Sequence, residues 1–145
     1  MSPIDYTGFR HGKGPTRTQV KAKRDARKHT ALRRTYDTVD SRDKQLSWVS
    51  GRPLTSGHVD DDCRLEHHHL ERRAQSKARI ADPNNVISVS AREADLLDTH
   101  ALIPVDASGG EVKDTRLIHG FAWNRAMVKP GAEPFPLPAR AKRAA

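Results

Sequence analysis

The apolar residues of this chain come in short runs, and this limits what it can fold into. Five runs of four to seven residues read as strands or short buried segments, separated by charged, glycine or proline-containing stretches. They are Leu46–Ser50, Leu65–Leu70, Val86–Val89, Leu102–Val105 and Leu117–Trp123. Only 35% of the 145 residues are hydrophobic and 5% are aromatic, so we expect one small core with polar arms.

Helices are expected on both sides of these runs. Ser90 and Glu93 form an S-x-x-E capping box, which predicts a helix from Ser90 to about His100. The sequence also allows a helix over residues 19–36, although this segment has few apolar side chains that could pack against a core. The last two runs read as strands around a turn at 107–110. The expected fold class is therefore α+β.

The charges divide the chain into a core and two arms. We assign 1–34 to a basic N-terminal arm, 35–106 to the folded core, 107–128 to a C-terminal strand extension and 129–145 to a proline-rich basic tail. The formal net charge of +8 indicates a polyanionic partner, and DNA is the one expected. Two compatible interpretations fit the arm: it is a solvated tail, and it is a segment that binds phosphates through Lys21, Lys23, Arg24, Arg27 and Lys28.

Cysteine content and hydropathy exclude other classes of protein. The single cysteine, Cys63, rules out an internal disulfide framework and a multi-cysteine zinc ribbon. No apolar run approaches the roughly 18 to 20 residues that cross a bilayer. The N-terminus also lacks the regions of a signal peptide. We expect a cytoplasmic protein without a membrane partner.

Three adjacent histidines, His67, His68 and His69, lie in the second run. Alternation along a strand puts His67 and His69 on one face and His68 on the other. A strand that ends there can still offer two adjacent imidazoles to one site, one as a metal ligand and one as a base. Asn85 follows after a basic loop, and an Asn carbonyl can orient a catalytic imidazole. Together with a divalent cation, these groups would suffice for phosphodiester hydrolysis.

The order of motifs resembles the HNH endonuclease family, in particular its phage-type members, whose core is the ββα-metal fold. The motifs span about residues 36–102 and are Arg42-Asp43, Gly51-Arg52-Pro53, His68-His69-Leu70, the basic loop 72–79 and Asn85-Val86. The resemblance implies that His68 is a metal ligand, His69 the general base and Asn85 the residue that orients it. It also places Arg72, Arg73, Lys77 and Arg79 where the family approaches the DNA backbone.

Two features depart from the family pattern. Its final helix commonly carries metal ligands four residues apart, and the matching positions here are Ala94 and Asp98. Asp98 can bind a cation and Ala94 cannot, so we expect Mg²⁺ first, with Mn²⁺, Ni²⁺ or Zn²⁺ as alternatives. Many relatives also carry two Cys-x-x-Cys knuckles. The corresponding segments, 47–50 and 90–93, lack such ligands, so no structural zinc is expected.

Two functions follow from these observations. The first is a metal-dependent DNA endonuclease or nickase with an HNH-type one-metal mechanism, acting in the host cytoplasm if it is phage-encoded. The alternative is a catalytically inactive HNH-derived protein that binds nucleic acid or serves as a phage structural protein, associated with the virion. Phage packaging or particle proteins would then be further partners. The nuclease hypothesis requires His68 and Asp98 to face each other across the junction of strand and helix.

Overall fold

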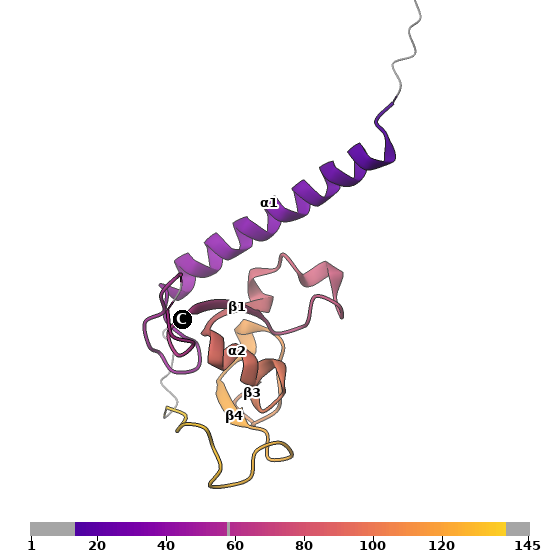
Figure 1. Cartoon of the computed structure of the whole chain (residues 1–145). Coiled ribbons are helices and arrows are strands. Elements are labelled where there is room, and N and C mark those ends of the chain that lie inside the picture. Colours follow the sequence, from indigo (N-terminus) through magenta and orange to yellow (C-terminus); the bar gives the residue numbers. More distant parts are fainter. Residues whose placement is uncertain (1–13, 58, 139–145) are drawn as a thin grey trace, which may run out of the picture. The chain divides into compact units, whose positions relative to one another are not determined.

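The computed structural model describes residues 14–57 and 59–138, and it confirms the α+β class (Figure 1). The α-helices are α1 (Arg17–Asp43) and α2 (Ala91–Asp98). Two antiparallel sheets of two strands each are present: β1 (Leu65–His69) with β2 (Val86–Ser90), and β3 (Leu102–Val105) with β4 (Gly120–Trp123). Short 3-10 turns occupy Lys77–Arg79, Pro83–Asn85 and Thr115–Leu117.

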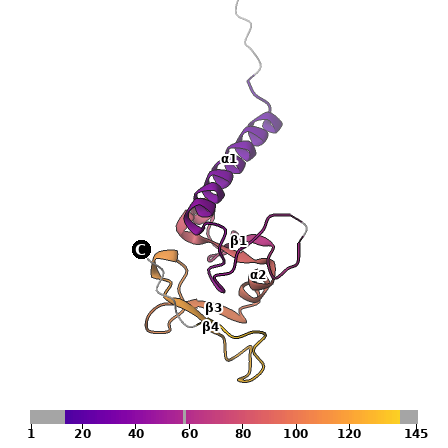
Figure 2. The same cartoon turned by 90° about the vertical axis from the view of Figure 1, so that its left-hand side faces the viewer.

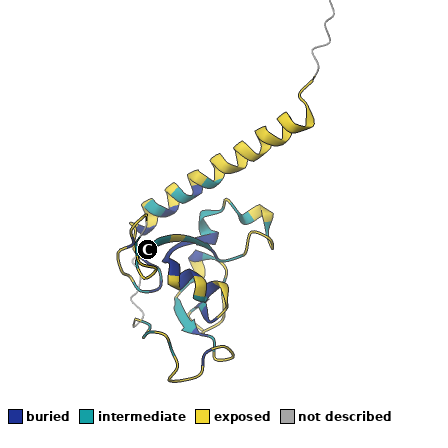
Figure 3. Cartoon of the chain, viewed as in Figure 1, coloured by how far each residue is buried: buried dark blue, intermediate teal, exposed yellow. Residues whose placement is uncertain are grey.

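The chain divides into two compact units, 1–31 and 32–145. The described residues of the first unit belong mainly to α1 and are exposed throughout (Figure 3). Thr16 and Gln19 exchange hydrogen bonds between side chain and backbone, which explains why the helix begins at Arg17. It also continues past the expected end at 36. Thr35, Val39 and Asp43 are buried at a spacing of four, so its last turns carry a narrow packed face within the second unit.

The strand predicted at 65–70 and the helix predicted to start at Ser90 are confirmed. Strand β1 pairs with β2 so that His67 lies opposite Ser88, and all five residues of β2 are buried. Helix α2 follows β2 directly. The Ser90 hydroxyl accepts from the Glu93 N–H at 3.2 Å, and the Glu93 carboxylate accepts from the Ser90 N–H at 2.8 Å. Helix α2 packs against β1, β2 and β3, so it joins the two sheets (Figure 1 and Figure 2).

The prediction of a strand at Leu46–Ser50 is wrong, because this segment is a turn. The Ser47 hydroxyl accepts hydrogen bonds from the N–H groups of Val49 and Ser50, at 3.0 and 3.1 Å. A serine that binds its neighbouring backbone in this way competes with strand pairing. The same hydroxyl donates to the Glu93 carboxylate at 2.5 Å. The segments 47–50 and 90–93 are therefore joined by a buried hydrogen bond.

The hydrophobic core lies between the two sheets and α2. Every predicted run except 65–70 contributes to its buried members, which also include residues of α2 and of two later segments: Val49, Ile87, Val89, Ala94, Leu97, Ala101, Leu102, Trp123 and Val128. Strand β4 begins at Gly120 instead of Leu117, because Leu117 belongs to a 3-10 turn and is exposed. None of the described helices is long and apolar enough to cross a membrane.

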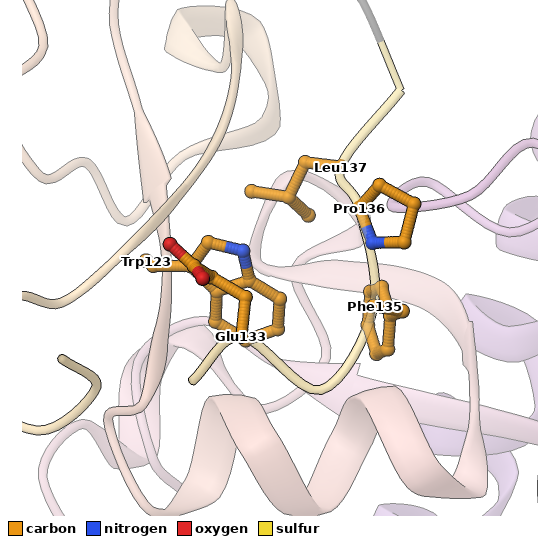
Figure 4. Close-up of a pocket in the computed structure, with 5 residues that line it drawn as sticks. All are labelled: Trp123, Glu133, Phe135, Pro136 and Leu137. Atoms are coloured by element: carbon orange, nitrogen blue, oxygen red, sulfur yellow. The ribbon is translucent and has the colours of Figure 1, made fainter. Parts of the chain in front are cut away.

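The segment after β4 covers one side of the core without regular structure. The Phe135 ring meets Trp123 edge-on, with centroids 5.1 Å apart, and the Arg92 guanidinium lies 5.5 Å above Phe135. Leu137 also packs against the core (Figure 4). The end of the predicted basic tail, 139–145, lies outside the described residues.

An ion pair between the partly exposed Arg42 and the buried Asp43 joins the end of α1 to β2. The Asp43 carboxylate accepts from Arg42 at 2.6 and 3.0 Å and from the Ser88 N–H at 3.0 Å. Arg42 also donates to the carbonyls of Pro83 and Val86, at 2.8 and 2.7 Å. Burial by itself raises the pKa of Asp43, but the hydrogen bonds from Arg42, Trp48 and Ser88 lower it below its ordinary value.

We predict that Asp43→Asn lowers the free energy of unfolding by about 1.5 to 3 kcal/mol, because it removes a charge-assisted contact to Arg42. The folded-state pKa is depressed, so this stabilisation is present above the unfolded pKa of about 3.9 and is lost as the pH falls below it. Urea unfolding at pH 7 and at lower pH measures both effects. Asp37→Asn, an exposed site on α1, is the control. Equal losses in the two variants would contradict the role of Asp43.

Candidate active site

A pocket of about 220 Å³ lies beside the histidine strand. Side chains from β1, the following loop and α2 line it: Glu66, His67, His68, His69, Arg72, Arg73, Ala94 and Asp98. All of them except Ala94 are ionisable: three are histidines, two are arginines and two are carboxylic acids. The pocket therefore combines proton-accepting and anion-binding groups in one place.

His68 and Asp98 are brought together on one side of β1. His68 points towards α2, where its Nδ1 lies 3.7 Å from Asp98 Oδ1. The His68 side chain is only 10% exposed, whereas that of Asp98 is 59% exposed. Ala94 lies one helical turn before Asp98 and lines the same pocket. The two predicted ligands thus face each other, and the third position of the pattern presents only a methyl group.

Burial lowers the pKa of His68. Asp98 opposes this change by favouring the charged imidazole, while the nearby His69 and Arg72 add to it. The imidazole is consequently neutral at pH 7. A neutral imidazole keeps a lone pair, which is the form that binds metals.

His69 lies on the opposite face of β1 from His68. Its Nε2 donates to the Ile80 carbonyl at 3.0 Å, so the proton resides on Nε2. Nδ1 has no hydrogen-bond partner among the residues the structure describes, and it carries the lone pair. Burial lowers the pKa of His69, the Ile80 bond raises it, and the charges of Arg73 and His67 lower it further. This imidazole can accept a proton at Nδ1.

Asn85 holds the loop between β1 and β2, and no hydrogen bond joins it to His69 in the described structure. Its side-chain carbonyl accepts from the Glu71 N–H at 2.7 Å. Its amide donates to the carbonyls of Glu71 and Arg79, at 3.1 and 3.0 Å. Arg79 precedes Ile80, whose carbonyl holds His69. Asn85 therefore holds the loop that carries Ile80, and the direct contact with His69 that the sequence suggested is absent among the described residues.

The predicted phosphate-binding residues of the loop differ in their surroundings. Arg72 donates to the Asp98 carbonyl and Arg73 to the Tyr36 hydroxyl, and both line the pocket. Lys77 is exposed outside it. Arg79 instead pairs with Glu71 at 3.2 Å, Asp82 at 3.3 Å and Asp114 at 3.5 Å. Three carboxylates of the protein itself neutralise the charge of Arg79, so we assign this residue a structural role.

Two residues of the site were missed by sequence reasoning. Tyr36 stacks on His67, with ring centroids 4.2 Å apart and an angle of 6° between the planes. Asp40 Oδ1 accepts from His67 Nε2 at 2.7 Å. Their spacing of four on a helix was the only available signal, and it does not reveal which strand the helix packs on.

The remaining candidates lie apart from the pocket residues. Lys21, Lys23, Arg24, Arg27 and Lys28 are exposed on the part of α1 that belongs to the first unit. A larger hollow of about 430 Å³ lies under the C-terminal segment, lined by Trp123, Glu133, Phe135, Pro136 and Leu137 (Figure 4). Its one carboxylate, Glu133, is already paired with Arg125 at 2.6 Å, so this hollow lacks free catalytic groups.

The chain was compared with family models, curated proteins and solved structures. No family model, curated protein or solved structure matches this chain. Within the described residues, no group of three or more histidine, cysteine, aspartate or glutamate side chains is placed to hold a metal ion. The pair of His68 and Asp98 offers two potential ligands, with Nδ1 and Oδ1 3.7 Å apart.

We predict that Asn85→Ala lowers the free energy of unfolding by about 2 to 4 kcal/mol, because it removes three hydrogen bonds from a fully buried side chain to the backbone of Glu71 and Arg79. The loop at 71–79 should also become more sensitive to proteolysis. Urea unfolding and limited trypsin digestion measure the two effects. Asn84→Ala removes only an acceptor for Thr115 and is the matched control. An equal loss in both variants would refute this role for Asn85.

Proposed function

We propose that this protein is a metal-dependent DNA endonuclease or nickase of the HNH type. The observation that carries the proposal is the position of His68 Nδ1, 3.7 Å from Asp98 Oδ1, in the pocket that His69 also lines. The order of β1, β2 and α2 supports a ββα-metal core, since the candidate ligands come from the first strand and the helix. The motif resemblance supports the same conclusion.

The donor set fits a hydrated divalent cation. Mg²⁺ is usually held through one or two carboxylates and keeps several waters, so Asp98 would be its main protein ligand, with His68 beside it. Mn²⁺, Ni²⁺ and Zn²⁺ also accept an imidazole with a carboxylate. A cation bound there would neutralise charge on the scissile phosphate and on the leaving oxygen.

The protein's own groups supply the other steps. His69 Nδ1 takes a proton from a water molecule, and the resulting hydroxide oxygen forms a bond to phosphorus. The bond between phosphorus and the leaving oxygen breaks, and that oxygen takes up a proton from solvent. Arg72 and Arg73 bind phosphate oxygens at the mouth of the pocket. The Ile80 carbonyl keeps the His69 proton on Nε2, so that Nδ1 stays the basic nitrogen.

The exposed part of α1 supports a nucleic-acid substrate. Arg17, Lys21, Arg24 and Lys28 recur at a helical spacing of three or four, and Lys23 and Arg27 broaden this basic face. None of these cations forms an ion pair within the described part of the chain. Unpaired cations along one helix face can replace counterions on a phosphate backbone, without preference for sequence.

Ala94 favours a second candidate function. With a methyl group at the third ligand position, the scaffold would bind nucleic acid without cleaving it, either alone or with phage packaging or particle proteins. This alternative retains the basic loop and the basic helix face. It differs from the first function in having no metal-dependent activity.

We predict that the protein nicks supercoiled plasmid in the presence of Mg²⁺, Mn²⁺ or Ni²⁺. His69→Ala should lower the rate by about 10²- to 10⁴-fold, because it removes the general base. Gel analysis of plasmid forms over time measures the rate. His119→Ala, an exposed histidine outside the pocket, should leave it unchanged. Absence of cleavage with every cation, together with salt-sensitive plasmid binding, would support the second function instead.

We predict that Ala94→His supplies the missing ligand, since residue 94 lines the pocket one turn before Asp98. Affinity for Zn²⁺ or Ni²⁺ should rise by at least about tenfold, which corresponds to about 1.4 kcal/mol. Titration calorimetry measures the affinity. Asp95→His places an imidazole on the exposed side of the same helix and is the control. An unchanged affinity in Ala94→His would contradict the assignment of the metal site.

A further inference from the structure

We infer that the last turns of α1 belong to the active site, with Tyr36 as a positioning residue for both His69 and Arg73. Asp40 and His67 complete this assembly. The inference rests on the proposed function, because it assigns a role around the catalytic base. His67 takes part in this assembly through its contacts with Asp40 and Tyr36.

The Tyr36 ring contacts both histidines on its face of β1. It stacks on His67 at 4.2 Å with nearly parallel planes, and it meets His69 edge-on at 6.2 Å with an angle of 68°. Both arrangements are favourable for aromatic rings. The imidazole of His69 is thus held at Nε2 by the Ile80 carbonyl and on one side by the Tyr36 ring. These two contacts set the direction of Nδ1.

Asp40 fixes the ring on which Tyr36 stacks. Its carboxylate accepts from His67 Nε2 at 2.7 Å, one helical turn after Tyr36. The His67 side chain is mostly buried in this contact. The contacts therefore form a series from Asp40 through His67 and Tyr36 to His69.

The hydroxyl of Tyr36 serves a second partner. It accepts a hydrogen bond from Arg73, which lines the pocket from the loop after β1. One side chain thus contacts the proposed base through its ring and a proposed phosphate-binding arginine through its hydroxyl. The two effects can be separated, because phenylalanine keeps the ring and removes only the hydroxyl.

Anchoring of α1 does not require Tyr36. Thr35 donates to the Ala81 carbonyl at 2.8 Å, Val39 is fully buried, and Asp43 binds Arg42 and the Ser88 N–H. Tyr36 itself is only partly buried and lies outside the hydrophobic core cluster. Substitution of Tyr36 is therefore expected to change the site more than the stability of the fold.

The test compares the kinetics of plasmid nicking by Tyr36→Phe and Tyr36→Leu. Tyr36→Phe should raise KM several-fold and leave kcat within about twofold, since only the Arg73 contact is lost. Tyr36→Leu should in addition lower kcat by about 10- to 100-fold, because the base is no longer aligned. Asp40→Asn should lower kcat relative to Asp37→Asn, which makes the same charge change on the exposed side of α1.

The outcomes separate this inference from the proposed function. Wild-type protein that does not cleave refutes the nuclease function and, with it, this role. An active wild type with the same kcat in Tyr36→Leu refutes the inference alone, as does an equal kcat in the Phe and Leu variants. If Tyr36→Leu fails to fold, as judged by urea unfolding, the Tyr36→Phe rise in KM and the Asp40→Asn fall in kcat decide the result. Absence of both changes overturns the inference.

Discussion

The site depends on the hydrogen bonds of one fully buried side chain, that of Asn85. Its three hydrogen bonds close the loop that leaves β1 and returns to β2, and each bonds a backbone group of Glu71 or Arg79. The closed loop brings the Ile80 carbonyl to His69 and holds Arg72 and Arg73 beside the pocket. Asn85 thus ties both ends of this loop, at Glu71 and at Arg79, to one buried side chain.

A small apolar core makes such polar contacts more important than they are in larger domains. Asp43 binds Arg42 and β2 at the end of α1, and Glu93 joins the turn at Ser47 to the start of α2. Each of these carboxylates is buried and accepts hydrogen bonds at a junction between segments distant in sequence. Breaking one leaves charged or polar groups without partners, which costs more than the loss of a typical surface contact.

The two faces of β1 receive different elements, and this separates the proposed roles of adjacent histidines. His68 faces α2 and meets Asp98, whereas His67 and His69 face α1 and contact Tyr36. His67, His68 and His69 nevertheless all line the same pocket. The proposed metal ligand and the proposed base are therefore positioned by different helices. Changes in α1 and α2 should affect different steps of the reaction.

Local patterns in the sequence were sufficient for several elements. The alternation in β1 placed the histidines on the correct faces, and the Ser90 and Glu93 capping box located the start of α2. These signals act over a few residues, so they can be read without the fold. The turn at Ser47, the extension of α1 to Asp43 and the hydrogen bonds of Asn85 to the loop were decided by tertiary contacts. So was the meeting of Asp40 with His67, 27 residues away. Such contacts depend on how segments pack, and no local periodicity encodes that.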